Sequence, residues 1–515
     1  MTWERVGAKS GTERREPIEQ MRRVAVIGGG ISGLAAAHHL IELAASAALP
    51  LRVALVEAGP RLGGVIHTER IGNCLVELGA DSFITNKPWA IDLCGRIGLK
   101  DRLISTNPKY RQALVLRKGK PAPVPAGFLL MAPTKIWPVV TSPIFSPLGK
   151  VRMGLERWIP PRTDAVDESV ASFVRRRLGR EALERLVQPL VAGIYTSDPE
   201  KLSLRATLPR FLEMERRHGS LIRAARRGVH ENNGATTDEK GTSGGLPESG
   251  ARYGLFVSFQ EGMSELVEAL ASRITAGGEV HLDARVSSLI RLDTPEELFS
   301  LSFATDLGTS THTTAFDAVI VALPADRAAD LVWPLDSMLA GALGEIEYAS
   351  SAIVCTGHSL ADVAHPLDAS GLVVPAVEKR RILSVSFASR KFIGRAPEGE
   401  VVLRTFLGGA LQPEILRHTD DELVQIVLSE LHEILGVRGE PRFAAVSRHE
   451  RAMPQYHVGH LDRIQRIEQL AAAHPRLALA GNAYDGVGIP DCVQSGQRAA
   501  ERIFRSLACR QEVKP

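Results

Sequence analysis

The feature that most constrains this chain is a short glycine-rich segment near its start. An apolar run at 24–27 leads into Gly28, Gly30 and Gly33, and an alanine-rich stretch follows at 34–40. Strand, tight turn and helix in this order, with G-x-G-x-x-G spacing, form the dinucleotide-binding fingerprint. Gly28 permits the turn, Gly30 lets the backbone approach a pyrophosphate, and Gly33 lets helix and strand pack closely. Free N–H groups at the helix start would bind the phosphates.

An acidic residue stands where this fingerprint requires one. Residues 52–59 read RVALVEAG, an apolar strand that ends at Glu57. A carboxylate there can accept both ribose hydroxyls of an adenosine and would repel a 2′-phosphate, so NADP is not expected. The alternative interpretation of Glu57 is a solvated residue at a strand end.

The segment after Glu57 and the rest of the chain narrow the type of dinucleotide. Arg61 and the glycine pair at 63–64 offer a positive charge and backbone N–H groups to phosphate. A second strand–GxGxxG–helix segment does not occur in the sequence. Reductases that use NAD(P)H usually carry one, so we expect an organic substrate to supply the electrons, as in an oxidase or desaturase.

Length and composition bound the remaining possibilities. A chain of 515 residues exceeds one hydrophobic core, and a net charge of +3 is too small to indicate nucleic-acid binding. The five cysteines lack metal-binding spacing, which indicates a reducing compartment such as the cytoplasm. Residues 1–20 are predicted to be a disordered leader, because they lack the apolar stretch of a signal peptide. No apolar run reaches the roughly 18 residues of a membrane-spanning helix.

Two segments leave their roles open. Prolines break up residues 105–160, and apolar groups alternate there with lysines. This pattern fits short helices packed over a substrate cavity, and it also fits a membrane-surface patch whose lysines meet anionic lipid. Residues 168–187 are predicted to form one amphipathic helix, with the arginines at 175–177 on its solvated face.

Four stretches carry a resemblance to a known family. Glu57 with RLGG (61–64) resembles the FAD-binding start of amine-oxidase-like flavoproteins. The sequences at 76–99, 168–204 and 481–496, the last reading GNAYDGVGIPDCVQSG, resemble oxygen-dependent protoporphyrinogen/coproporphyrinogen oxidases of haem biosynthesis. With PQYHVGH at 454–460, the resemblance spans nearly the whole chain.

The resemblance implies an α/β fold of the p-hydroxybenzoate-hydroxylase type, in which a Rossmann-type FAD-binding domain carries a second α+β substrate domain. The boundaries that we expect are a discontinuous FAD-binding domain at 21–104, 254–330 and 446–508, a helical substrate lobe at 105–225, a disordered insertion at 226–252 and a substrate-domain sheet at 331–445.

The implied reaction is the oxidation of protoporphyrinogen IX to protoporphyrin IX in three two-electron steps, with O2 reduced to H2O2. Hydride passes to the flavin N5, so no catalytic side chain is singled out. Coproporphyrinogen III is the alternative substrate. Another flavin amine oxidase or desaturase, and a non-catalytic escort protein without FAD, are further alternatives. The expected location is the cytoplasm, with peripheral contact to the inner face of the cell membrane left open, as is the oligomeric state.

The resemblance also assigns individual residues. Plant and animal members hold a substrate propionate with an arginine where this chain reads Gln112 and Ala113, so Arg111 and Lys118 are the candidates for that role. His457 and His460 are interpreted as structural, and no metal site is expected. The implied FAD contacts are Gly28, Gly29, Gly30, Ile31, Ser32, Gly33, Glu57, Ala58, Arg61, Gly64, Val65, Gly79, Ala80, Asp81, Ser82, Val286, Val487, Gly488 and Ile489.

Overall fold

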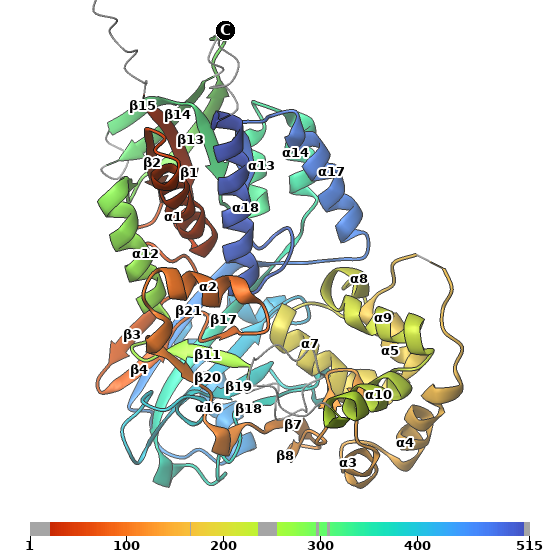
Figure 1. Ribbon diagram of the computed structural model, residues 1–515. Helices are drawn as coiled ribbons and strands as arrows, with labels where there is room; N and C mark the ends of the chain where they lie inside the picture. Colours follow the sequence, from red (N-terminus) through yellow and green to blue (C-terminus); the bar gives the residue numbers. More distant parts are fainter. Residues whose placement is uncertain (1–20, 165, 235–254, 295–297, 306–309, 509–515) are drawn as a thin grey trace, which may run out of the picture.

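A computed structural model describes residues 21–164, 166–234, 255–294, 298–305 and 310–508 (Figure 1). The predicted leader at 1–20 lies outside these residues, as does most of the predicted insertion. Two large sheets, several smaller ones and a helical lobe make up the described part. The two large sheets lie one above the other in Figure 1, and the lobe of helices α3–α10 lies beside the lower sheet.

The first sheet is parallel, and its strands are gathered from distant parts of the chain. Its order is β12 (Glu279–His281), β2 (Leu51–Val56), β1 (Arg22–Ile27), β16 (Ala318–Val321) and β22 (Leu477–Leu479). Side chains of β1 alternate between two hydrophobic cores, one on each face of the sheet. A parallel strand buried on both faces reads as a continuous apolar run, which is why 24–27 carries no polar residue.

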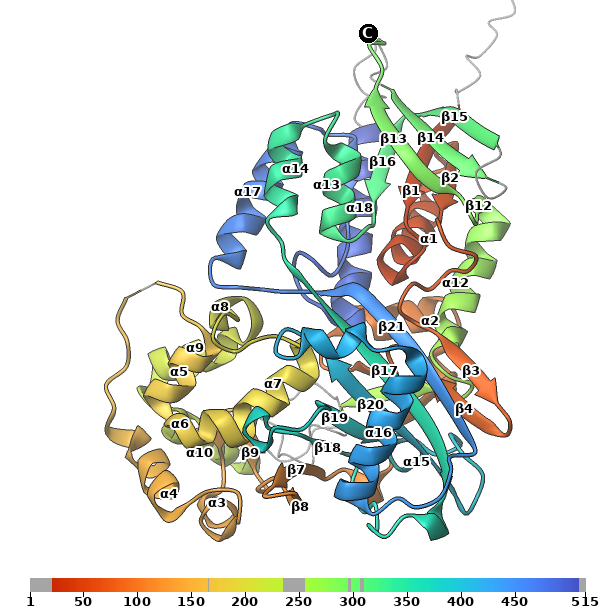
Figure 2. The same cartoon turned by 180° about the vertical axis from the view of Figure 1, so that it is seen from behind.

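Helices and a small sheet cover the two faces of this parallel sheet. One face packs against α1 (Ile31–Ser46), α12 (Ser264–Gly277) and α18 (Ile489–Ala508). The other carries an antiparallel meander and three helices, namely β13 (Arg285–Arg291), β14 (Phe299–Thr305), β15 (Ser310–Phe316), α13 (Ala325–Val332), α14 (Ser337–Gly344) and α17 (His460–Ala472). Three distant segments of the chain therefore build one Rossmann-type domain, as Figure 2 shows from behind.

The second sheet has seven strands and is antiparallel except where β18 runs parallel to β7. Helix α16 (Asp420–Leu435), which begins with a capping box at Thr419, covers one face. The hairpin of β3 (Thr68–Ile71) and β4 (Cys74–Glu77) packs on the other. In order the strands are β21 (Phe443–Pro454), β17 (Tyr348–Ser359), β20 (Glu400–Gly408), β19 (Ser384–Phe387), β18 (Gly371–Val373), β7 (Ala113–Arg117) and β8 (Lys120–Pro123).

Shorter elements join the two sheets. The strands β5 (Phe83–Ile84), β11 (Phe256–Phe259) and β6 (Leu103–Ser105) form a small antiparallel sheet. Helix α2 (Pro88–Arg96) connects β5 to β6, and the short helix α15 (Ala388–Lys391) follows β19 of the seven-stranded sheet. No helix of the described residues combines the length and the apolar character that crossing a membrane requires.

The helical lobe starts later than predicted. Residues 113–123 form a hairpin at the edge of the seven-stranded sheet, so the boundary at 105 is wrong. Residues 113–116 form a continuous apolar run, which does not by itself distinguish a buried strand from part of a helix, and the turn at Gly119 closes the hairpin. The remaining elements are β9 (Phe128–Leu129), β10 (Ala132–Pro133), α3 (Ile136–Thr141), α4 (Pro147–Gly154), α5 (Val170–Arg177), α6 (Arg180–Ala182), α7 (Gln188–Tyr195), α8 (Leu204–Thr207), α9 (Pro209–His218) and α10 (Leu221–Gly234).

Three other predicted boundaries also differ from the structure. Helix α10 runs to Gly234, so the insertion predicted from 226 begins too early. Helices α13 and α14 pack on the parallel sheet although 331–344 was assigned to the substrate domain. Strand β21 belongs to the seven-stranded sheet although it extends past 446. The last two errors arise because an apolar pattern alone does not identify the sheet with which a segment packs.

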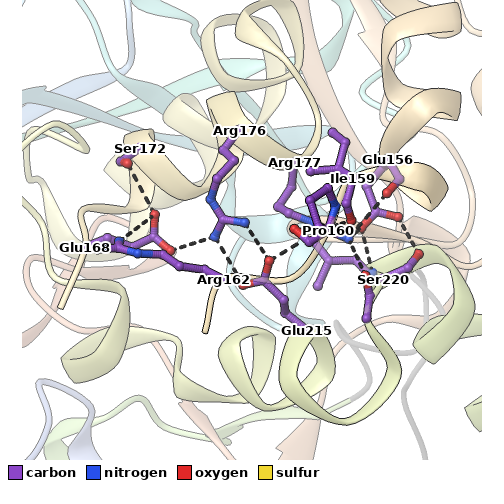
Figure 3. A network of polar contacts seen from close by, with 12 residues as sticks. Glu156, Ile159, Pro160, Arg162, Glu168, Ser172, Arg176, Arg177, Glu215 and Ser220 are labelled. Carbon is purple, nitrogen blue, oxygen red and sulfur yellow. Dashed lines mark hydrogen bonds and ion pairs between the residues drawn. The ribbon is translucent and has the colours of Figure 1, made fainter. Parts of the chain in front are cut away.

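The arginine run at 175–177 corrects a further expectation. The predicted helix at 168–187 breaks after α5, where Gly179 has φ +95°. Arg177 is fully buried and pairs with Glu156, whose Oε2 also accepts from Ser220 Oγ at 2.6 Å. Arg176 binds Glu215 at 2.6 Å and Glu168 at 2.8 Å (Figure 3). The solvated-face interpretation is therefore wrong for both residues, since they form a buried network that holds the lobe together.

Candidate functional site

The three fingerprint glycines differ in how much space surrounds them. Gly28 has φ +106°, and a Cβ on it would lie 2.4 Å from the carbonyl oxygen of Ala322. A Cβ on Gly33 would lie 1.9 Å from the carbonyl oxygen of Gly28. Around Gly30, in contrast, a Cβ would meet no heavy atom within 4 Å. The fold itself thus requires Gly28 and Gly33, whereas Gly30 borders open space.

That open space lies at the start of helix α1. No side chain caps the helix there, and Gly30 occupies the N-cap position with φ −69° and ψ 174°. The first helical residues, Ile31 and Ser32, are buried. An uncapped helix start offers N–H groups and the positive end of the helix dipole, which together suit a phosphate. The geometry fits the pyrophosphate of a dinucleotide.

Glu57 lies beside the glycine loop at the end of β2. Its Oε2 accepts a hydrogen bond from the Gly29 N–H at 2.6 Å, and its Oε1 accepts from the Gly59 N–H at 2.8 Å. The backbone N–H of Ala284 donates to the Glu57 carbonyl at 2.9 Å, which brings Val286 close to the same strand end. Glu57, Ala58 and Val286, predicted to hold ribose and adenine, therefore lie together.

The turn after Glu57 folds back onto the glycine loop. Arg61 donates to three carbonyl oxygens of its own turn, those of Leu62, Gly64 and Ile66, at 2.8–3.1 Å. A Cβ on Gly64 would lie 3.3 Å from the Cα of Gly30. The guanidinium thus shapes the turn rather than standing free for phosphate, and it presents Gly64 and Val65 beside Gly30.

Residues 79–82 pack against this turn. A Cβ on Gly79 would lie 1.5 Å from the carbonyl oxygen of Val65, so only glycine allows the two backbones to meet. Asp81 forms ion pairs with Lys391 at 2.9 Å and with Arg404 at 2.8 Å. Sequence reasoning missed both cations. The indication in the sequence was Arg404, a single cation inside the apolar strand EVVLRTFLG at 400–408. Exposure of one face of the strand to water does not explain an isolated charge there.

The C-terminal segment returns to the same place. A Cβ on Gly496 would lie 2.2 Å from the carbonyl oxygen of Ser32, so α18 crosses α1 in close contact. Ile489 begins α18 and is buried, and Val487 packs against the core of the helical lobe. The Lys87 ammonium binds the Asp491 carboxylate at 2.5 Å. Residues 487–489 therefore lie where the Rossmann domain, α2 and the helical lobe meet.

The substrate-carboxylate candidates lie apart from each other. Arg111 is half-buried and donates to Thr106 from Nε at 3.3 Å and from Nη2 at 3.2 Å. Lys118 is exposed at the β7–β8 turn, on the outer edge of the seven-stranded sheet. Its backbone N–H donates to Glu378 at 2.8 Å. The structure brings neither side chain into contact with the glycine loop.

Both histidines near 460 have structural surroundings. His460 is fully buried, its ring stacks on Tyr456 at 3.8 Å, and burial lowers its pKa to about 4. His457 pairs with Glu347 at 3.5 Å and lines an open cleft of about 510 Å³. None of the predicted cofactor contacts lines that cleft. The described residues contain no group of His, Cys, Asp and Glu that could hold a metal ion.

Comparison with known proteins decides what this site is. Flavin containing amine oxidoreductases, as a family, match residues 31–504. The chain belongs to this family. Coproporphyrinogen III oxidase of Bacillus subtilis is 33% identical, over 94% of this chain and 98% of that protein. Protoporphyrinogen oxidase 2 of Arabidopsis thaliana is 29% identical, over 98% and 99%.

A solved structure agrees with the sequence relatives. It is that of an Exiguobacterium sp. 255-15 protein assigned provisionally as a protoporphyrinogen oxidase, with TM-score 0.80 and 29% identity over 95% of this chain and 99% of that one. The predicted family, the α/β FAD-binding fold and the oxidoreductase class are thereby confirmed. FAD is the cofactor of this flavoprotein, and the open space at Gly30, the uncapped start of α1 and the Glu57 carboxylate fit its pyrophosphate and ribose.

Proposed function

We propose that this flavoprotein oxidises a porphyrinogen to the corresponding porphyrin in haem biosynthesis, and that coproporphyrinogen III is its preferred substrate. The similarity to the Bacillus subtilis coproporphyrinogen III oxidase over nearly the full length of both chains carries the proposal. The plant protoporphyrinogen oxidase is less similar. This preference reverses the order in which the sequence alone ranked the two substrates.

The arrangement of the site is consistent with that chemistry. FAD, when bound, supplies the hydride acceptor. The described residues around the glycine loop would bind and orient it, mostly through backbone N–H groups of α1 and through Glu57. The chain would then need only to hold the substrate carbon against the flavin in a dry space, and no acid, base or nucleophile of its own is required.

A comparison of two substrates tests the proposal. Flavin-loaded protein is supplied in separate assays with coproporphyrinogen III and protoporphyrinogen IX, and porphyrin fluorescence and oxygen consumption are followed. We expect both to be oxidised, with the higher kcat/KM for coproporphyrinogen III. A higher value for protoporphyrinogen IX would refute the preference, and oxidation of amines but of neither porphyrinogen would refute the porphyrinogen oxidase.

Arg111 is proposed to hold a substrate carboxylate. It is half-buried beside Thr106, on the segment that packs next to Lys391 through the Asn107 N–H. Losing one charge-assisted hydrogen bond costs about 1.5–3 kcal/mol, so Arg111→Ala should raise KM for coproporphyrinogen III about tenfold or more at unchanged kcat. Lys118→Ala, at the exposed outer turn, is the matched control. Equal KM values for the two variants would reject the role of Arg111.

A peripheral contact with a lipid surface is proposed for α3, α4 and the turn after them. Leu148 is 83% exposed, Trp137 76% and Trp158 71%. Helices α3 and α4, which carry Trp137 and Leu148, lie at the outer edge of the helical lobe in both views. Exposed Ile136, Val140, Val151 and Leu155 extend the same surface. Clustered apolar groups of this kind commonly mark a contact with a protein or a membrane, and nearby cations such as Arg157 favour anionic lipid.

Vesicle binding tests this contact. The protein should co-sediment with vesicles containing anionic lipid and less with neutral ones. The double variant Trp137→Ser/Leu148→Ser should release it while leaving FAD content unchanged. Trp333→Ser removes another exposed tryptophan, 61% exposed, on the Rossmann domain and serves as control. Equal sedimentation of wild type and double variant would refute the contact.

A further inference from the structure

Three buried and two partly buried charged side chains lie between residues 77–82 and the seven-stranded sheet. Glu77 and Asp81 face Lys391 at the end of α15, Arg395 just beyond it, and Arg404 in the middle of β20. Arg404 is 1% exposed, Arg395 2% and Glu77 3%. We refer to these five residues as the charge cluster. The charge cluster connects residues 79–82, which are proposed to contact the flavin, to the second domain.

Arg404 makes the central contacts of the charge cluster. Its Nε donates to the Glu77 carbonyl at 2.8 Å, its Nη2 donates to the Gly79 carbonyl, and its Nη1 pairs with Asp81 at 2.8 Å. Lys391 adds bonds to both Asp81 oxygens at 2.9 Å. A cation is therefore bonded directly to the peptide groups of the segment that packs on Val65 and lies next to the glycine loop.

The charge cluster carries an excess of positive charge. It contains three cations and two carboxylates, so one positive charge is left when both carboxylates are ionised. Burial raises the pKa of Glu77, which can only increase that excess. Burial opposes ionisation of Asp81 as well, but Lys391 and Arg404 hold the pKa of Asp81 well below its usual range.

The surroundings do not cancel this excess. Glu261 and Glu265 lie next to Arg395, but Arg70 and Arg102 respectively pair with them. Burial raises the pKa of the Cys355 thiol to about 11 and lowers the pKa of His449, so both stay neutral at pH 7. The positive charge of the cluster therefore acts in a site of low dielectric constant.

Burial decides what the excess charge can act on. Arg404 is too deeply buried to bind a substrate carboxylate, and its contacts with Glu77, Gly79 and Asp81 already use all three guanidinium nitrogens. What lies on the far side of residues 79–82, in the proposed site, is the flavin. FAD gains a negative charge when it accepts a hydride, and a fixed positive charge nearby stabilises the reduced form.

We propose that Arg404, with Lys391, is a positioning residue that places a net positive charge behind residues 79–82 and thereby raises the reduction potential of the bound flavin. The inference rests on the flavin position in the proposed function. The inference gives β20 and α15 of the second domain a role in the reduction of the flavin. The FAD-binding sequence motifs lie in the first domain and include neither element.

The test measures the flavin potential rather than activity. Holoprotein of wild type, Arg404→Gln, Arg404→Lys and the control Arg502→Gln is titrated against a reference dye under anaerobic conditions. Arg502 is a half-buried cation about 20 Å along α18 from Ile489. We expect Arg404→Gln to lower the equilibrium constant for two-electron reduction of the flavin about tenfold, which lowers the reduction potential by about 30 mV. Arg404→Lys should recover most of that loss, and Arg502→Gln should match wild type.

Sulfite binding gives a second reading, because the sulfite–flavin adduct is anionic. The sulfite Kd should rise about tenfold in Arg404→Gln and less in Arg404→Lys. Lys391→Gln, at a less buried position, should shift both readings in the same direction and replaces Arg404→Gln should that variant fail to fold. Wild-type potential and sulfite Kd in a variant that holds FAD would overturn the proposal. A wild type that holds FAD but oxidises no porphyrinogen would overturn only the proposed function.

Discussion

Replacing Gly30 with alanine separates the cofactor role of the glycine loop from its role in the fold. The added Cβ would meet no protein atom within 4 Å, and φ −69° with ψ 174° suits alanine. The cofactor-free protein should therefore keep its stability or gain about 0.4–1 kcal/mol, because alanine restricts the unfolded chain. The same methyl would occupy the space that a pyrophosphate needs.

The cost to FAD binding follows from the contacts displaced. A hydrogen bond between a backbone N–H and a charged phosphate contributes about 1.5–3 kcal/mol. Loss of one such bond at the start of α1 raises the Kd of FAD about ten- to a hundredfold. The apoprotein is titrated with FAD while flavin fluorescence is followed, and thermal unfolding of the apoprotein is measured in parallel.

Two further glycine variants serve as controls. Gly33→Ala would place its Cβ 1.9 Å from the Gly28 carbonyl oxygen, so it should lower both the stability of the apoprotein and FAD binding. Gly341→Ala, in open space on α14, should leave FAD affinity unchanged. Wild-type FAD affinity in Gly30→Ala would refute the assignment of this space to the pyrophosphate.

Two further predictions concern the buried charges. Glu156→Gln removes the nearer of the two carboxylates that pair with the buried Arg177 and leaves only Glu215, at 3.3 Å, which should lower the free energy of unfolding by about 3 kcal/mol in urea, whereas Arg180→Gln, in an exposed pair, should leave the midpoint unchanged. Equal midpoints for the two variants would contradict the network in Figure 3. The pKa of His460 is lowered to about 4, so the unfolded chain binds a proton below its usual pKa of about 6.5 while the folded chain does not. Stability should therefore fall by about 2 kcal/mol between pH 7 and pH 5, and His460→Phe should remove that part of the slope; an unchanged slope would show that His460 is not buried in its neutral form.

The parts of the site that the sequence could predict are those built from local backbone geometry. The glycine loop, Glu57 and the turn at 61–64 each lie in one short stretch whose residue types dictate its shape. The expected FAD-binding domain includes residues 446–508, so the return of α18 to the glycine loop follows from that assignment. Gly496 against Ser32 is the contact that makes this return possible.

The parts that could not be predicted depend on partners far away in the chain. A run of three arginines at 175–177 is typical of an exposed helix face, and the burial of Arg177 depends on its pairing with Glu156 from a separate helix. Arg404 is separated from Asp81 by more than the length of a domain, so its strand showed only an unexplained charge in an apolar run. The hairpin at 113–123 was assigned to the wrong domain because its sheet partner, β18, lies far downstream.

The central claim is that a porphyrinogen itself reduces the flavin of this chain. Its most direct test is to mix flavin-loaded protein with coproporphyrinogen III without oxygen and to follow the visible flavin absorbance. We predict that the flavin is bleached as substrate is oxidised, and that admitting oxygen restores its colour and releases H2O2. A flavin that stays oxidised in the presence of both coproporphyrinogen III and protoporphyrinogen IX would contradict the claim.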